Sequence, residues 1–271
     1  MSEILIFAAF LLFGISLFAG RQKKYAAIGG WTFIVINLSS EVTAYIKAEN
    51  FLYPLLASVS IPFLALTVRF LLRDDPLVLQ ISRTAAIATI IYMPFAIIPV
   101  LHDALIQAVV NQAFWIILAL GHHPQMPAWN IITENGFANQ IILGCTGITA
   151  LSIMLGIAAA VPNLSRKQGI VAFFLAGPLI YLLNLLRVAI VFIAVSDAWF
   201  WFLPDLSGNT GFRAADFFWA HNVFAEALAI IALLAITLGM FRIIPALAVA
   251  ARGLVDLYTG SVKAFFKRGS A

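Results

Sequence analysis

Three side chains with complementary chemistry are spread along the 271-residue chain: its only cysteine, Cys145, then Arg187, then His221. A cysteine thiolate is a nucleophile, and an imidazole can take the thiol proton. The same imidazole can then protonate a leaving amine. A guanidinium can stabilise the oxyanion of a tetrahedral intermediate or position the substrate carbonyl. If the fold brings these groups together, they form a site for acyl transfer.

Each of these residues also has an ordinary structural interpretation. A lone cysteine between glycines, as in Gly144-Cys145-Thr146-Gly147, fits a small packing residue of a membrane helix. Arg187 can extend its side chain to the membrane surface or form a buried ion pair, for which Glu41 is a candidate. His221 can be an interfacial residue with no special role. The choice depends on the elements that position these residues.

The composition of the chain indicates its environment. Hydrophobic residues make up 63% of the chain and charged residues only 10%, whereas a soluble domain carries about 25% charged residues. A soluble fold could not bury that much apolar surface and would aggregate. The composition therefore excludes a soluble enzyme, a nucleic-acid-binding protein and a disordered protein. It predicts an all-α, polytopic helical membrane protein.

Apolar runs along the chain predict the membrane-spanning segments. A helix needs about 20 apolar residues to cross a bilayer. Runs of suitable length predict about seven transmembrane helices, at Ile4–Ala19, Ala26–Ile46, Phe51–Leu72, Thr84–Leu101, Ile141–Val161, Gly169–Ser196 and Trp219–Arg242.

The lysines and arginines predict the orientation of these helices. With alternating crossings, all of them except Lys47, Arg187 and Arg213 fall on one side. The positive-inside rule makes this side the cytosol. We therefore expect a multi-pass protein of the cell membrane, with its N-terminus outside and its C-terminus in the cytosol.

The stretch Asp103–Leu120 decides the count of crossings. If it crossed, the basic pair Arg166–Lys167 would lie outside, against the positive-inside rule. Its polar residues recur at helical spacing and form one polar face: Asp103, Gln107, Asn111 and Gln112. We therefore expect an amphipathic helix that lies on the outer membrane surface.

The sequence gives no sign of a second domain. We expect a single membrane domain over 1–271, with four helices in 1–101 and the three helices that carry the chemistry in 136–244. The segment 245–271 is basic and predicts an amphipathic helix on the cytosolic surface.

The predicted topology brings the three candidate residues to one side of the membrane. Cys145 lies near the outer end of the fifth predicted helix, Arg187 in the outer half of the sixth, and His221 at the outer start of the seventh. The two outer loops, 121–140 and 197–218, are rich in aromatic residues, which fit the headgroup level and leave substrate contact open.

Further residues are candidates for support of the site. Asn184 precedes Arg187 by three residues and so shares its helix face. Thr146 adjoins the cysteine, and Gly147 allows a backbone or a substrate to approach closely. Either Asp216 or Glu226 could orient the imidazole of His221, and the sequence does not choose between them.

At these residues the chain resembles the exosortase/archaeosortase family. The resemblance rests on Gly144-Cys145-Thr146-Gly147, then Asn184-Leu185-Leu186-Arg187, then His221, and it covers roughly Gly136–Met240. The first four predicted helices are similar to the family only in being membrane helices. Arg213 is a rival of His221 as the third member of the site.

The resemblance implies a membrane cysteine protease/transpeptidase. Such enzymes recognise a C-terminal signal on secreted surface proteins, which consists of a short motif, a transmembrane helix and a basic cluster. They cut near the motif on the outer face and pass the acyl group to an acceptor, which for archaeosortases is a membrane lipid amine. Cys145 would then be the nucleophile, His221 the general base and acid, and Arg187 the oxyanion-stabilising or substrate-positioning group.

Other classes of function fit the sequence less well. Charge within the membrane and the helix-breaking Pro94, Pro99 and Pro178 also occur in small-molecule transporters, but the sequence shows no internal repeat. A membrane assembly factor is the other alternative. We expect no metal and no cofactor, because His122 and His123 are adjacent and cannot both face one site from a regular helix, and the chain has no His-Glu-x-x-His run.

Overall fold

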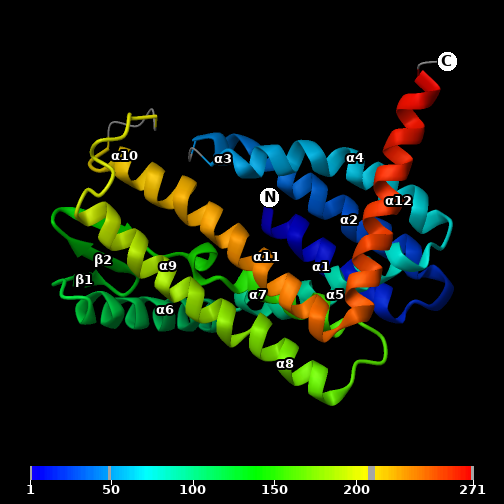
Figure 1. Ribbon diagram of the computed structural model, residues 1–271, viewed down its shortest axis with the longest axis horizontal. Coiled ribbons are helices and arrows are strands. Elements are labelled where there is room, and N and C mark those ends of the chain that lie inside the picture. Colours follow the sequence, from blue (N-terminus) through cyan, green and yellow to red (C-terminus); the bar gives the residue numbers. More distant parts are fainter. Residues whose placement is uncertain (1, 48–49, 207–210, 270–271) are drawn as a thin grey trace. The chain divides into compact units, whose positions relative to one another are not determined.

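The computed structural model describes residues 2–47, 50–206 and 211–269, and most of these residues are helical (Figure 1). The N-terminal half contains α1 (Ser2–Phe18), α2 (Lys23–Ser40), α3 (Val42–Lys47), α4 (Leu52–Leu72), α5 (Pro76–Ile97) and α6 (Pro99–Ala119). The C-terminal half contains α7 (Ile148–Ala159), α8 (Arg166–Ala176), α9 (Pro178–Ser196), α10 (Ala214–Phe217), the π-helix η3 (Phe218–Ala225), α11 (Glu226–Ile243) and α12 (Pro245–Gly269).

The described helices confirm a polytopic helical membrane protein. Five segments are long and apolar enough to cross a membrane: Leu52–Leu72, Pro76–Ile97, Pro99–Ala119, Arg166–Ser196 and Ala214–Ile243. Two shorter apolar helices, Ile4–Phe18 and Ile148–Ala159, accompany them. The number of crossings and the orientation of the termini stay predictions.

Four of the predicted continuous helices are interrupted. The fourth predicted span breaks at Ile98, between α5 and α6, and the sixth breaks at Gly177, between α8 and α9. The second predicted span breaks at Glu41, between α2 and α3. The fifth is wrong as a single helix, because it begins with the 3₁₀ turn η2 (Leu143–Thr146) and becomes α-helical only after Gly147. Gly147 has a φ of 76°, in the left-handed region, where an α-helix cannot continue. The cysteine is therefore presented by a turn.

The predicted outer loop 121–140 contains a small antiparallel sheet, so the described chain is not purely helical. Its strands pair in the order β1 (Gln125–Ala128), β2 (Ile131–Glu134), β3 (Phe137–Gln140). The turn between β2 and β3 is Asn135-Gly136, with φ values of 50° and 80°. This pair is the preferred sequence for a two-residue hairpin of type I′, in which both central residues need a positive φ.

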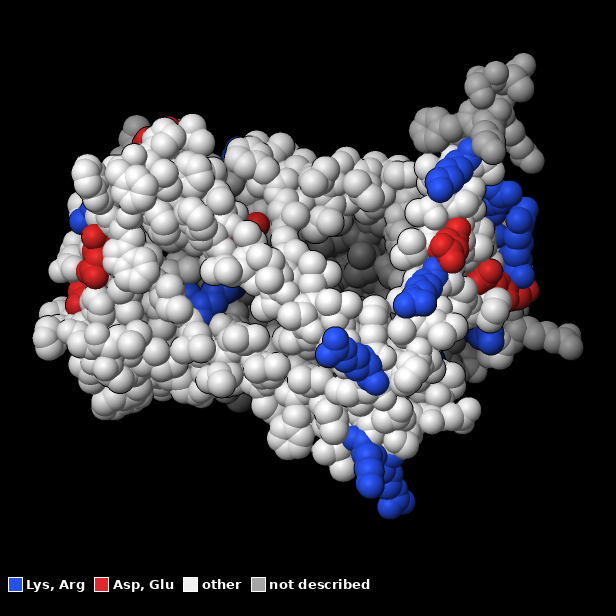
Figure 2. Space-filling view, in the orientation of Figure 1, with Lys and Arg blue, Asp and Glu red and all other residues white. Residues whose placement is uncertain are grey.

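The chain forms two compact units, and it passes between them within α5, α7, α8 and α11. Unit 1 contains Met1–Ile91, Ser152–Phe173 and Leu238–Ala271, and unit 2 contains Tyr92–Leu151 and Phe174–Thr237. All lysines and arginines except Arg187 and Arg213 belong to unit 1. Figure 2 shows several of them over α12 and near the start of α8. The two units thus differ strongly in positive charge.

In unit 1, the C-terminal helix contributes to the core. The side chains of Leu254, Leu257 and Tyr258 on α12 pack against a cluster that contains Phe70 and Leu71 of α4. The Tyr258 hydroxyl lies 2.7 Å from the hydroxyl oxygen of a buried threonine on α4. Helix α12 therefore uses an apolar face for packing within unit 1, in addition to the basic character that the sequence predicts.

In unit 2, the core lies between α6, α9 and the sheet. Val109, Val110 and Ala113 of α6 are fully buried, in one cluster with Ala189 and Phe192 of α9. The polar face predicted for this helix is exposed: Asp103, Gln107, Asn111 and Gln112. The opposite face, however, packs along α9, and α6 is itself a candidate span. The structure thus differs from the prediction of a helix that lies only on the outer surface.

Candidate functional site

The thiol of Cys145 lies on the 3₁₀ turn η2 and is partly buried against the core of unit 2. The turn is held by Thr146, whose side chain is buried. The Thr146 hydroxyl donates a 2.7 Å hydrogen bond to the carbonyl oxygen of Leu143 and accepts a 3.4 Å bond from the backbone N–H of Ile148. These bonds connect the two sides of the turn to the start of α7, so the threonine supports the turn that carries the thiol.

Asn184 connects this turn to α9 by a hydrogen bond. Its Nδ2 donates a 2.8 Å hydrogen bond to the carbonyl oxygen of Cys145. A Cβ atom at Gly147 would lie 2.8 Å from Cγ of Asn184, which is closer than real Cβ atoms come. Glycine at this position therefore serves two needs, a positive φ and the close approach of the turn to the Asn184 amide.

The guanidinium of Arg187 lies one turn further along α9 and links this amide to the histidine. Nη1 donates to Oδ1 of Asn184 at 3.5 Å, and Nη2 lies 3.2 Å from Nε2 of His221. The Nε atom is buried and has no hydrogen-bond partner. The guanidinium therefore still has an unused N–H donor, at Nε, inside the site.

His221 lies on the π-helix η3, which precedes α11. Its ring stacks on the ring of Phe217, with centroids 4.9 Å apart and an interplanar angle of 8°. Its Nδ1 lies 2.8 Å from Oδ1 of Asn222. Both ring nitrogens thus have partners, Arg187 at Nε2 and Asn222 at Nδ1. Asn222 occupies the place for which the sequence offered Asp216 or Glu226.

One network therefore connects the three separated segments that the sequence singled out. It runs from the carbonyl oxygen of Cys145 through Asn184 and Arg187 to His221 and then Asn222. All of these residues belong to unit 2. The network reaches the cysteine at its backbone, and its hydrogen bonds order the guanidinium and the imidazole near the turn that carries the thiol.

Arg213 has different surroundings. Its Nη1 lies 3.7 Å from Oδ2 of Asp216, and its guanidinium carbon lies 5.2 Å from the ring centroid of Phe212. Asp216 is buried and also accepts a 3.0 Å hydrogen bond from the backbone N–H of Phe200. Through Asp216, α10 is thus connected to the backbone at Phe200, which follows α9. Glu226 begins α11 and is half-buried there.

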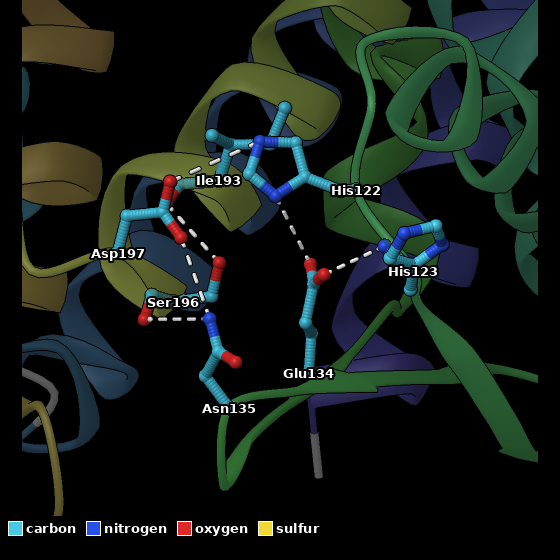
Figure 3. Close-up of polar contacts among 7 residues, drawn as sticks. All are labelled: His122, His123, Glu134, Asn135, Ile193, Ser196 and Asp197. Atoms are coloured by element: carbon cyan, nitrogen blue, oxygen red, sulfur yellow. Dashed lines mark hydrogen bonds and ion pairs between the residues drawn. The ribbon is translucent and has the colours of Figure 1, made fainter.

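A second polar cluster connects the sheet to the C-terminal end of α9 (Figure 3). Nδ1 of His122 lies 3.3 Å from one carboxylate oxygen of Glu134, and its Nε2 lies 3.8 Å from Oδ2 of Asp197. The other oxygen of Glu134 accepts a 2.7 Å hydrogen bond from the backbone N–H of His123. Asn135 donates to Oδ1 of Asp197 at 3.4 Å. Across the described residues, no group of three His, Cys, Asp or Glu side chains is placed to hold a metal ion.

Comparison with known proteins identifies relatives of this chain. The model of the transmembrane exosortase family matches residues 3–218, so the match includes Cys145 and Arg187 and ends before His221. The match begins in α1, and the similarity therefore extends further toward the N-terminus than the sequence motifs predict.

Two curated relatives are archaeosortases A. The one from Haloferax volcanii is 29% identical over 217 residues, which cover 69% of each chain. The one from Natronomonas pharaonis is 32% identical over 201 residues, which cover 66% of this chain and 62% of the relative. No solved structure matches the chain significantly.

Proposed function

Because the chain belongs to the transmembrane exosortase family, we propose that it is a membrane cysteine transpeptidase that cleaves C-terminal sorting signals of surface proteins. The proposal rests chiefly on one observation. A single hydrogen-bond network links the turn that carries the sole cysteine with a partly buried arginine and a histidine, although these residues are far apart in the sequence. This combination supplies a nucleophile, an acid–base group and a permanent cation.

The proposed reaction begins at Cys145. Its thiol transfers a proton to Nε2 of His221, and the sulfur attacks the carbonyl carbon of the scissile peptide bond. The tetrahedral intermediate collapses when the C–N bond breaks, and the leaving amine takes the proton from the imidazole. The product is a thioester. An acceptor amine then attacks this thioester, forms the new amide bond and releases the thiol.

The resting network must open for this proton transfer. Nε2 of His221 faces Nη2 of Arg187 at 3.2 Å. The arginine therefore occupies the Nε2 lone pair that must accept the thiol proton. Catalytic hydrogen bonds are often long in a resting enzyme and tighten when the substrate binds. We propose that the substrate carbonyl draws the guanidinium away from the imidazole, which frees Nε2 for the thiol.

Arg187 is suited to the oxyanion. Its guanidinium is always protonated, and its Nε–H is already buried without a partner. Within a membrane span the low dielectric strengthens its interaction with a developing negative charge. A lysine would carry the same charge but not the planar set of donors that reaches Asn184 and the reacting group together.

The distribution of charge supports a proposal for the side of the reaction, and the resemblance to archaeosortases supports one for the acceptor. Arg187 and Arg213 are the arginines of unit 2, which has no lysine, and the other lysines and arginines belong to unit 1. By the positive-inside rule, the loops of unit 2 then face the exterior. We propose that the thioester forms there and that the amine of a membrane phospholipid is the acceptor.

A processing assay tests this proposal. The chain is co-expressed with a surface protein that ends in a short motif, a transmembrane helix and a basic cluster, and the precursor and product are separated on a gel. Cys145→Ala should leave only the precursor. Ser152→Ala changes a small buried side chain on α7, outside the network. This variant should process normally and controls for insertion. Normal processing by Cys145→Ala would exclude the mechanism and favour an assembly role or transport.

A further inference from the structure

The contact between His221 and Asn222 is unusual for neighbours in a helix. Successive residues of an α-helix do not face each other, yet Nδ1 of His221 lies 2.8 Å from Oδ1 of Asn222. Both residues lie in the π-helix η3 (Phe218–Ala225). π-Helices are rare and occur frequently at functional sites. The departure from α-helical geometry thus coincides with this side-chain pair.

The partners of the imidazole fix its proton. A guanidinium has only donors, so Nε2 of His221 must accept from Nη2 of Arg187 across their 3.2 Å contact. A neutral imidazole with a bare Nε2 carries its proton on Nδ1. That proton needs an acceptor, and Oδ1 of Asn222 supplies one at hydrogen-bond distance. The Nδ1–H tautomer of His221 therefore satisfies both contacts, the one with Arg187 and the one with Asn222.

We propose that Asn222 is a positioning residue of this site, which holds His221 as the Nδ1–H tautomer and so keeps the Nε2 lone pair directed toward Arg187 and the reaction. Phe217 restricts the ring plane by stacking on it, and Asn222 restricts rotation within that plane. The inference rests on the proposed function, because the lone pair on Nε2 is the one that accepts the thiol proton. Asn222 itself touches neither the substrate nor the sulfur.

Two substitutions separate positioning from packing. Asn222→Leu keeps a side chain of similar size and removes the acceptor, whereas Asn222→Asp keeps an acceptor oxygen. We expect processing to fall roughly 10- to 100-fold in Asn222→Leu, by analogy with the loss that follows removal of the partner that orients a metal-binding histidine. Asn222→Asp should process faster than Asn222→Leu. Asn222→Ala provides the same loss of the acceptor if the leucine variant does not insert.

The tautomer is measured directly by nitrogen NMR on the full-length protein in lipid nanodiscs, with ¹⁵N-labelled histidine. The chain has 4 histidines, and a His221→Gln sample identifies the signals of His221 by difference. The wild type and Asn222→Asp should show a protonated Nδ1 and a bare Nε2. In Asn222→Leu and Asn222→Ala, the two nitrogen shifts should move toward each other as the tautomers mix.

The outcomes for the inference and for the proposed function are separate. If the variants without the acceptor keep the wild-type nitrogen shifts and the wild-type processing rate, the inference is overturned. If Cys145→Ala still processes substrate, the proposed function fails, whereas the nitrogen shifts still decide whether Asn222 sets the tautomer. A loss of processing with unchanged nitrogen shifts would also overturn the inference, because packing alone would then explain the loss.

Discussion

Replacement of Gly147 by alanine perturbs the site without touching any reacting group. The residue has a φ of 76°, and an added Cβ would lie 2.8 Å from Cγ of Asn184. The backbone would have to adopt a conformation that disfavours alanine, and the Asn184 side chain would have to move. This movement breaks the 2.8 Å hydrogen bond to the carbonyl oxygen of Cys145.

The expected cost follows from these two effects. A left-handed conformation costs a non-glycine residue about 1–2 kcal/mol, and the lost hydrogen bond costs about 1 kcal/mol. If the whole cost of about 2–3 kcal/mol falls on the arrangement of the site, processing slows roughly 30- to 150-fold. If it falls on folding instead, the same free energy appears as a lower unfolding temperature in nanodiscs.

Gly144→Ala is the matched control for this prediction. Gly144 has no neighbouring atom within 4 Å of an added Cβ, and it is not among the residues with positive φ. The processing assay and thermal unfolding followed by tryptophan fluorescence compare the two variants. We expect Gly144→Ala to behave as the wild type in both measurements. Equal behaviour of the two variants would refute the claim that the Gly147–Asn184 contact holds the turn.

Three further predictions follow from other contacts. Arg187→Lys should reduce processing at least about tenfold, because the single ammonium group of lysine cannot reach the Asn184 amide and the His221 imidazole together. Arg213→Lys should retain most of the processing activity, since Arg213 pairs with Asp216 outside the network. Glu134→Ala should lower the free energy of unfolding by about 1–3 kcal/mol, because the nearly buried Glu134 carboxylate accepts a 2.7 Å hydrogen bond from the backbone N–H of His123. Thermal unfolding measures this loss. Tyr258→Phe should cost about 1 kcal/mol by the same measurement, since it removes the 2.7 Å hydrogen bond to Thr67, and no effect on unfolding would mean that this bond contributes nothing.

The membrane class could be predicted from the sequence because it depends on composition alone. The arrangement around the cysteine could not, because it depends on the conformation of one residue. An apolar run from Ile141 to Val161 reads as one helix, and only the positive φ of Gly147 ends the turn before α7. Glycine is compatible with both conformations, so the residue type does not choose between them.

The sheet had a signal that the hydrophobic pattern obscured. Asn135-Gly136 is the strongest short-range indicator of a hairpin, but its strands have four residues each and adjoin apolar runs. Asn222 had no comparable signal, since a contact between adjacent helical residues needs the π-helix that the sequence pattern does not reveal. By contrast, the spacing of Asn184 and Arg187 predicted a shared helix face, and the structure confirms their contact.

The central claim is that the sulfur of Cys145 carries the acyl group. Mass spectrometry of the enzyme, quenched with acid during turnover of a tagged substrate and digested, tests it directly. The account predicts a substrate adduct, labile to hydroxylamine as a thioester is, on the peptide that contains Cys145, and no adduct in Cys145→Ala. The claim is contradicted if the wild type turns over substrate with no adduct on this peptide and the Cys145→Ala variant is as active as the wild type.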